Sequence, residues 1–300
     1  MAKIISLINM KGGVGKTTLC IGIADHLASL GYRTLLIDID PQFNATQGLL
    51  NLYKAPTTDD ETLDNSSFYE SDILPNQKTV FRLFKTQSTL QDTYTMPSKD
   101  EIITNLKLNL DIICGDLNLL LINKISNHTF AKRLDNFIKC RKLNKDYDYI
   151  LIDCPPTLTI YTDSALIASD YYLIPNRVDR YSIIGIESLR KAISSLTIEE
   201  NLSLKCLGVI YTMVDNKNPK KQTSIMQRFK NKCDDNEFYI FDSTSKIVND
   251  IQRGVSGTVP TLYKSSKEDI EAITDEIITT IEREYSNKKT INNKNKRGDQ

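Results

Sequence analysis

The sequence lacks three features that would assign a protein to a class at once: a long apolar run, closely paired cysteines and a net charge. No apolar stretch approaches the roughly 18 residues that a membrane-spanning helix needs. The chain enters an apolar, strand-like run directly after its first residues, so we expect neither a signal peptide nor a membrane span. Together these absences favour a cytoplasmic protein.

Cysteine spacing excludes two further classes. The six cysteines are scattered and form no C-x-x-C pair, which argues against a zinc site and against a disulfide framework. We interpret them as mostly buried small hydrophobic residues of a reducing compartment. They are Cys20, Cys114, Cys140, Cys154, Cys206 and Cys233.

The charges balance overall but are unevenly distributed. The chain has 38 basic and 38 acidic residues, so no global field indicates a nucleic-acid partner. Residues 59–72 are acidic, whereas residues 217–232 and 288–297 are basic. The segment 287–300 has almost no apolar residue and is expected to be a disordered tail, which either solubilises the chain or contacts DNA.

Alternating strand and helix patterns predict an α/β fold. At 40% hydrophobic and 25% charged residues, the chain can bury a substantial core. We expect a single doubly wound, mostly parallel sheet flanked by helices, within one domain that spans residues 1–286. Residues 53–78 show no clear periodicity and are expected to be a surface insertion. The expected strands after the first are 34–37, 110–113, 149–152, 171–174 and 206–211, and the expected helices are 19–30, 130–142, 162–168, 183–196, 223–232 and 268–285.

A glycine-rich loop follows the first expected strand and precedes the first expected helix. Three glycines in four positions let the backbone N–H groups surround an anion, Lys16 can reach the terminal phosphates of a nucleotide, and the Thr17 hydroxyl is a natural Mg²⁺ ligand. The alternative is a glycine-rich turn that happens to contain lysines, but the order strand, loop, helix favours a phosphate site. The loop consists of Lys11, Gly12, Gly13, Val14, Gly15, Lys16, Thr17 and Thr18.

Two aspartates directly follow expected strands. Ligands of open α/β sheets bind beyond the carboxyl ends of the strands, where Asp40 and Asp153 lie. Asp153 has the form of a Walker B aspartate, which holds Mg²⁺ directly or through water. Helix capping or a turn is the alternative role for each aspartate.

The loop also departs from the general P-loop pattern, because Met10 stands where a glycine is usual and Lys11 adds a second lysine. In this respect the sequence resembles the ParA/MinD family, the P-loop ATPases with a deviant Walker A motif. The segment 38–46 is similar to the family's Walker A′ motif, D-x-D-P-Q-x-N-A-T, and Asp153-Cys-Pro-Pro and the segment 208–215 are similar to further family motifs. The resemblance extends over about 250 residues, which is far more specific than an isolated P-loop.

The resemblance implies an ATPase that uses ATP and Mg²⁺. Lys11 would reach across an ATP-dependent homodimer to the partner's nucleotide, Asp40 would orient the attacking water, and Lys16 would bind the terminal phosphates. Thr17, Asp40 and Asp153 would hold the magnesium ion. The nucleotide would be bound by residues 11–18.

The resemblance further implies nonspecific DNA binding by the dimer. Lysine and arginine contacts to phosphates supply such binding. The candidates are Lys217, Lys220, Lys221 and Lys246, although Asn249 stands where the family has a second basic residue. A solvated loop is the alternative for the lysines of this basic segment.

Among members of the superfamily, a ParA-type partition ATPase fits best. The tail offers only Ile291 as an apolar residue, so a membrane-docking helix of the MinD type is not expected. The cysteines form no convincing iron–sulfur ligand set, and from the early P-loop we expect no preceding helix-turn-helix domain. Two functions remain: a nucleoid-associated DNA partition protein that a centromere-binding, ParB-like adaptor stimulates, and a nucleotide-gated ATPase that positions a protein complex without DNA.

Overall fold

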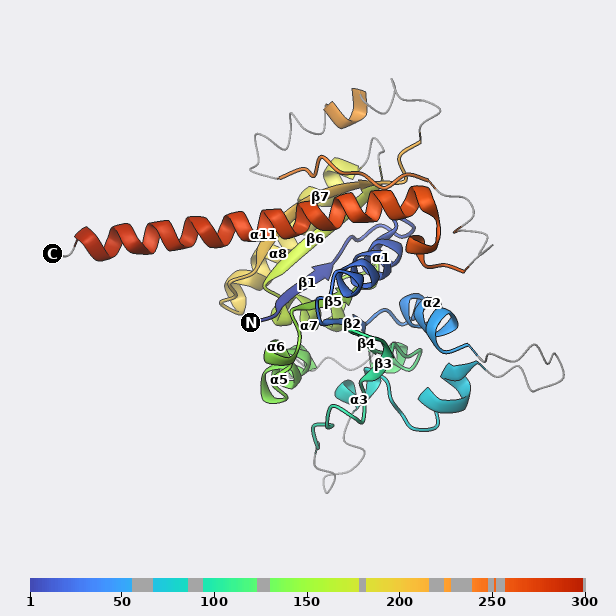
Figure 1. The fold of residues 1–300 in the computed structure, drawn as a ribbon. Coiled ribbons are helices and arrows are strands. Elements are labelled where there is room, and N and C mark those ends of the chain that lie inside the picture. The colour runs from blue at the N-terminus through green and yellow to red at the C-terminus, as the bar shows by residue number, and fades with distance from the viewer. Residues whose placement is uncertain are drawn as a thin grey trace.

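A computed structural model describes residues 1–55, 67–85, 94–122, 130–177, 182–215, 224–227, 239–247, 251 and 257–298. The described residues form a seven-stranded sheet with the order β3-β4-β2-β5-β1-β6-β7 (Figure 1). All neighbouring strands are parallel except β3 and β4. The strands are β1 (Lys3–Leu7), β2 (Thr34–Asp38), β3 (Thr104–Lys107), β4 (Leu110–Ile113), β5 (Tyr149–Asp153), β6 (Tyr171–Arg177) and β7 (Lys205–Thr212).

Helices cover both faces of this sheet. Each parallel pair needs a crossover connection, which places a helix against one face. The helical elements are α1 (Lys16–Ser29), α2 (Asn44–Tyr53), the π-helix η1 (Tyr69–Ile73), α3 (Phe81–Phe84), α4 (Leu119–Ile122), α5 (Arg133–Cys140), α6 (Leu143–Asp146), α7 (Ile160–Ala168), α8 (Ser182–Glu199), the 3₁₀ turn η3 (Pro260–Leu262) and α11 (Lys264–Gly298).

Two hydrophobic clusters separate the helices by face. Residues of α1, α2 and α11 pack on one face, with Leu27, Leu49 and Ile273 fully buried. Residues of α5, α7 and α8 pack on the other, where Phe137 and Leu189 are fully buried. The sheet is therefore doubly wound and mostly parallel, as the sequence predicts.

The centre of the sheet is buried throughout, and this explains the apolar sequence of its strands. All five residues of β2 and all five of β5 are buried, because helices cover both sides. Leu36 lies opposite Leu151, and Asp38 lies opposite Asp153. The carboxyl ends of these two adjacent strands thus bring the two aspartates to the same edge of the sheet.

Several boundaries differ from the sequence prediction. The strand expected at 171–174 continues through Pro175 to Arg177, where it pairs with β7. The edge strand β3 was not predicted, because its four residues give only a short alternation of buried and less buried side chains. The helix expected at 130–142 is shorter in the structure, where α5 spans Arg133–Cys140. A separate helix, α6, begins at Leu143 after Lys142, which adopts a left-handed backbone conformation.

Residues 53–78 are not simply a surface insertion. Within the described part of this segment, Tyr69 and Ile73 are buried in the core beside α1 and α2. The irregular sequence pattern reflects the π-helical turn, whose spacing matches neither an α-helix nor a strand.

The expected disorder of residues 287–300 stays a prediction. The backbone of α11 continues as a helix to Gly298 and extends beyond the rest of the fold (Figure 1). Residues 287–297 contain neither proline nor glycine, so nothing in the backbone stops a helix that has already been nucleated.

The cysteines follow the expected pattern in part. Cys20, Cys114 and Cys154 are buried, Cys206 is half-buried and Cys140 is exposed. Cys233 lies outside the described residues. Within the described ranges, no helix combines the length and the apolar character needed to cross a bilayer.

Candidate nucleotide-binding site

The glycine-rich loop connects β1 to α1 and turns sharply at two glycines. Gly13 has φ +67° and Gly15 has φ +81°, and these left-handed conformations are costly for residues with a Cβ atom. Val14 between them is buried. Gly15 also caps α1 without any side-chain hydrogen bond, so the first amides of the helix are available to an anion at this place.

Two side chains brace the loop: Asn9, which follows β1, and Thr212, which ends β7. The Asn9 amide donates to the Pro175 carbonyl at 2.7 Å, and its oxygen accepts the Lys11 backbone N–H at 2.9 Å. The Thr212 hydroxyl donates to the Val14 carbonyl at 2.7 Å. Sequence analysis did not select Asn9 or Thr212 as site residues. Their position close to the end of a strand was the only indication of a role.

Lys16 is directed into the protein at the start of α1. It is only 7% exposed, and this burial lowers the pKa of its ammonium group. The nearby carboxylates of Asp153 and Asp40 act in the opposite direction and favour the charged form. The structure therefore brings together three of the side chains that sequence analysis selected.

Asp153, at the end of β5, is fully buried, and neither of its carboxylate oxygens meets the geometry of a hydrogen bond. Burial and the nearby Asp38 raise its pKa strongly, while the Thr17 hydroxyl and Lys16 partly oppose the shift. An unsatisfied buried carboxylate is costly unless a cation binds it.

This arrangement fits a magnesium ion. Mg²⁺ is commonly bound by one or two protein ligands together with water and substrate phosphates. The described residues contain no cluster of three or more His, Cys, Asp or Glu side chains suited to a metal, so a dedicated protein cage is not present among them. Asp153 and Thr17 could hold the ion while phosphate oxygens complete its coordination.

Asp40 lies in a tight turn after β2. Its Oδ1 accepts the Gln42 backbone N–H at 2.9 Å, and its carbonyl accepts the Phe43 N–H at 2.9 Å. Asp40 is 8% exposed, which leaves part of the residue accessible at the edge of the sheet. The structure thus places the Asp40 carboxylate in one cluster with the Asp153 carboxylate.

Asp38 holds this turn from within and was missed as a site residue. Its Oδ2 accepts both the backbone N–H and the hydroxyl of Thr46 at 2.8 Å, and its Oδ1 accepts the Asp40 N–H at 3.2 Å. Burial is the main cause that raises the pKa of Asp38 to about 7. The first aspartate of the D-x-D pattern was the sequence signal for this residue.

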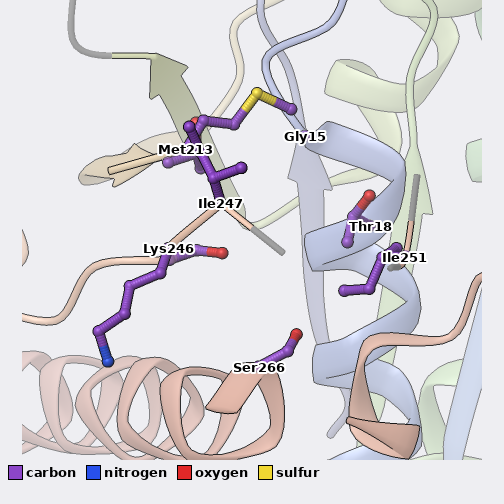
Figure 2. A pocket seen from close by; sticks show the side chains of 9 residues that line it. Gly15, Thr18, Met213, Lys246, Ile247, Ile251 and Ser266 are labelled. Carbon is purple, nitrogen blue, oxygen red and sulfur yellow. The ribbon is translucent and has the colours of Figure 1, made fainter. Parts of the chain in front are cut away.

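A recess opens beside Gly15 and the first turn of α1 (Figure 2). Apolar side chains, hydroxyls and backbone line it, so it offers both apolar surface and hydrogen-bonding groups. Its lining residues are Gly15, Thr18, Thr212, Met213, Ser245, Lys246, Ile247, Ile251 and Ser266.

Lys246 has a structural partner. Its Nζ donates to Asp269 Oδ1 at 2.8 Å and its backbone N–H donates to Oδ2 at 2.8 Å, so the side chain points toward α11 (Figure 2). The other DNA-binding candidates, Lys217, Lys220 and Lys221, lie outside the described residues. Lys11, Gly12 and Gly13 are exposed at the start of the loop.

Comparison with known proteins agrees with this geometry. Residues 2–206 match a family described as "AAA domain". The sporulation initiation inhibitor protein Soj of Bacillus subtilis is 35% identical over 220 residues, which cover 72% of this chain and 74% of Soj. The chromosome partitioning protein ParA of Myxococcus xanthus is 34% identical over 217 residues, covering 72% of this chain and 67% of that protein.

Solved structures share the fold at lower identity. A putative plasmid partition protein from Borrelia burgdorferi, solved with AMPPNP, superposes with a TM-score of 0.68 at 21% identity and covers 93% of this chain and 98% of its own. The apo structure of McdA from Cyanothece gives a TM-score of 0.68 at 20% identity, with 94% and 100% covered.

Proposed function

Because this chain belongs to the ParA-type partition ATPases of the ParA/MinD family, we propose that it hydrolyses ATP in order to segregate DNA. One observation carries the catalytic part of this proposal. The unsatisfied, buried carboxylate of Asp153 lies near Thr17 and Lys16 at the loop where a triphosphate would bind. A cation bound at this place would supply the partner that the carboxylate oxygens lack.

The chemistry follows from the positions of the side chains. The loop amides and the Lys16 ammonium group bind the phosphate oxygens and favour the charge that develops on them during transfer. Thr17, Asp153 and Asp40 would hold a magnesium ion, which would neutralise phosphate charge when bound. Asp40 orients the attacking water, because its carboxylate lies at the sheet edge that the phosphates face.

The recess beside Gly15 accepts the adenine base. Met213 and Ile247 offer apolar surface to the ring, and the hydroxyls of Ser245 and Ser266 are available as hydrogen-bonding groups. Gly15 belongs to the phosphate loop and also lines the recess, so one nucleotide can reach both.

The remaining steps depend on association. Lys11, exposed at the start of the loop, contributes its charge to the nucleotide of a second subunit, so that hydrolysis is slow until two chains enclose two ATP molecules. The dimer binds DNA nonspecifically through the basic segment that contains Lys217, Lys220 and Lys221. A ParB-like adaptor at the centromere stimulates hydrolysis, and the ATP-bound protein is cytoplasmic and associated with the nucleoid.

Two variants test the catalytic roles. Lys16→Ala is expected to abolish ATP binding, because the terminal phosphates lose their nearest cation. Asp40→Ala is expected to retain ATP binding and ATP-dependent dimerisation while turnover stops. Normal steady-state hydrolysis by Asp40→Ala would remove this residue from the catalytic role.

A salt titration of DNA binding tests the choice of cargo. Affinity for any duplex should require ATP and fall steeply with salt, and the triple variant K217E/K220E/K221E should weaken it and flatten the salt dependence. ATP-driven dimerisation of the triple variant serves as the control. If the ATP-bound wild type has no affinity for DNA, the chain is a positioning ATPase for a protein complex instead.

A further inference from the structure

The turn that carries Asp40 contains a strained residue. Phe43 adopts φ +40° and ψ +37°, a left-handed conformation that is unusual for a bulky side chain. Phe43 lies three residues after Asp40. The hydrogen bond from the Phe43 N–H to the Asp40 carbonyl closes the turn that contains both residues. Surrounding contacts must therefore hold Phe43 in place.

Tyr69 supplies one of these contacts. The rings of Phe43 and Tyr69 are stacked, with centroids 4.9 Å apart and planes inclined by 14°. Tyr69 belongs to η1, in the segment whose purpose the sequence pattern does not explain, and it is 7% exposed. The neighbouring Ile73 is fully buried, so the core anchors the element that carries the tyrosine ring.

Gly115 supplies a second contact. A Cβ atom at this position would lie 2.6 Å from the Phe43 Cβ and 3.0 Å from the Asp38 Cγ, so only glycine fits there without displacement. The Tyr69 hydroxyl donates to the Gly115 carbonyl at 2.9 Å. Phe43 is thus packed against both the Tyr69 ring and the Gly115 backbone, and these two are bonded to each other.

The same cluster reaches the carboxylates. The Gly115 N–H donates to the Thr46 hydroxyl at 2.8 Å, and that hydroxyl donates to Asp38 Oδ2. Asp38 in turn accepts the Asp40 N–H. The Asp40 turn is therefore held at both ends by one connected set of contacts.

We propose that Tyr69 is a positioning residue for ATP hydrolysis, which acts through its stacking on Phe43 to hold the Asp40 carboxylate in the orientation that activates water. This rests on the proposed role of Asp40. In this role Tyr69 acts through Phe43 and not by contact with the reacting atoms. It gives the segment around η1 a role in turnover, because loss of the stack would let the strained turn relax away from the phosphates.

The test separates binding from turnover. In Tyr69→Leu we expect the turnover number to fall about tenfold or more, since a displacement of a positioned group by about 1 Å is sufficient for such an effect. The dissociation constant for ATP should stay within about threefold of wild type, because the glycine-rich loop is untouched. Tyr69→Phe keeps the stack and should restore most of the turnover.

Tyr53→Leu is the matched control. Tyr53 is a partly buried tyrosine whose hydroxyl bonds to Asp25, away from the Asp40 turn. Thermal unfolding of each variant shows whether it is folded at the assay temperature. Equal losses of turnover in Tyr53→Leu and Tyr69→Leu would overturn the proposal, because general destabilisation would then explain both.

The Asp40→Ala variant distinguishes a failure of the positioning role of Tyr69 from a failure of the catalytic role of Asp40. If Asp40→Ala has lost turnover while Tyr69→Leu hydrolyses ATP as fast as wild type, only the positioning role is overturned. If Asp40→Ala itself retains turnover, the proposed catalytic role fails, and the positioning role fails with it.

Discussion

The hydroxyl of Thr212 donates a buried hydrogen bond of 2.7 Å to the backbone carbonyl of Val14, 198 residues earlier in the chain. This bond links the carboxyl end of β7 to the middle of the glycine-rich loop. It fixes the loop from the side on which the base recess lies. The shape of the phosphate site thus depends on a strand that contributes no charge to it.

Thr212→Val should therefore weaken nucleotide binding. The substitution keeps the shape of the side chain but leaves the Val14 carbonyl without this donor, at a cost of about 1 kcal/mol or roughly a fivefold loss of affinity. Calorimetric titration with ATP and magnesium measures the change.

Thr34→Val is the control for this prediction. The Thr34 hydroxyl is also buried and bonds to the Tyr32 carbonyl at 3.0 Å, at the opposite end of the sheet. The Thr34→Val substitution should lower the melting temperature about as much as Thr212→Val does, without changing the affinity for ATP. Equal affinities of Thr212→Val and wild type would show that the bond does not shape the loop.

Asp153→Asn should stabilise the nucleotide-free protein while it weakens binding of Mg²⁺ with ATP. The raised pKa means that the native state holds the Asp153 proton more tightly than the unfolded chain does, so native stability decreases as pH rises above the ordinary carboxyl range near 4. Removal of this charge should raise the free energy of unfolding at pH 8 by about 1–3 kcal/mol. Chemical denaturation between pH 5 and pH 8 measures the slope, and an unchanged slope in Asp153→Asn would contradict this assignment.

Asp269→Asn should impair recognition of the base and spare recognition of the phosphates. Asp269 holds Lys246 by its backbone and its side chain, and residues 245–247 form one wall of the recess. A weaker hold on this wall should lower ATP affinity about fivefold, which corresponds to about 1 kcal/mol. Inorganic triphosphate, which has no base, should bind as in wild type. Equal losses for ATP and triphosphate would place the defect in the phosphate loop.

Asp25 should affect the pH dependence of stability in the direction opposite to that of Asp153, which the substitution Asp25→Asn tests. Burial alone would raise the pKa of Asp25, but hydrogen bonds from Lys107, Thr261 and Tyr53 outweigh it and leave the pKa below its ordinary value. The stability that this carboxylate contributes is thus present above about pH 4 and is lost as pH falls through the lowered pKa.

The substitution should cost about 2 kcal/mol at pH 7 and progressively less in acid. Urea denaturation at pH 7 and at pH 3 measures both values. A constant difference across that range would mean that the charge of Asp25 has no part in the effect.

The shape of the glycine-rich loop between β1 and α1 could be predicted from the sequence because the motif is local. Gly13 and Gly15 must lie close along the chain to form one turn, and Lys16 follows them at the start of α1. The alternation of apolar runs likewise predicted the parallel strands, since β2 and β5 are buried on both faces.

Contacts between distant segments could not be predicted in this way. The Tyr69 ring meets Phe43 only after the chain has passed through a π-helical turn that gives no periodic signal. Lys246 was selected as a cation for DNA, but its pairing with Asp269 depends on how α11 packs beside the end of β7. Such pairs are set by the tertiary arrangement and not by spacing along the sequence.

The two edges of the sheet have a consequence for self-association. The β3 edge is only four residues long and its register is irregular at Asn105 and Lys107. The longer β7 edge is already paired, because residues 239–246 exchange backbone hydrogen bonds with Val209, Tyr211 and Val214. Within the described part of the chain, neither edge offers a long free strand to which another sheet could add. Association of two copies through the described residues would therefore use side-chain surfaces, which a bound nucleotide can complete or withdraw, whereas growth by strand addition would escape such control.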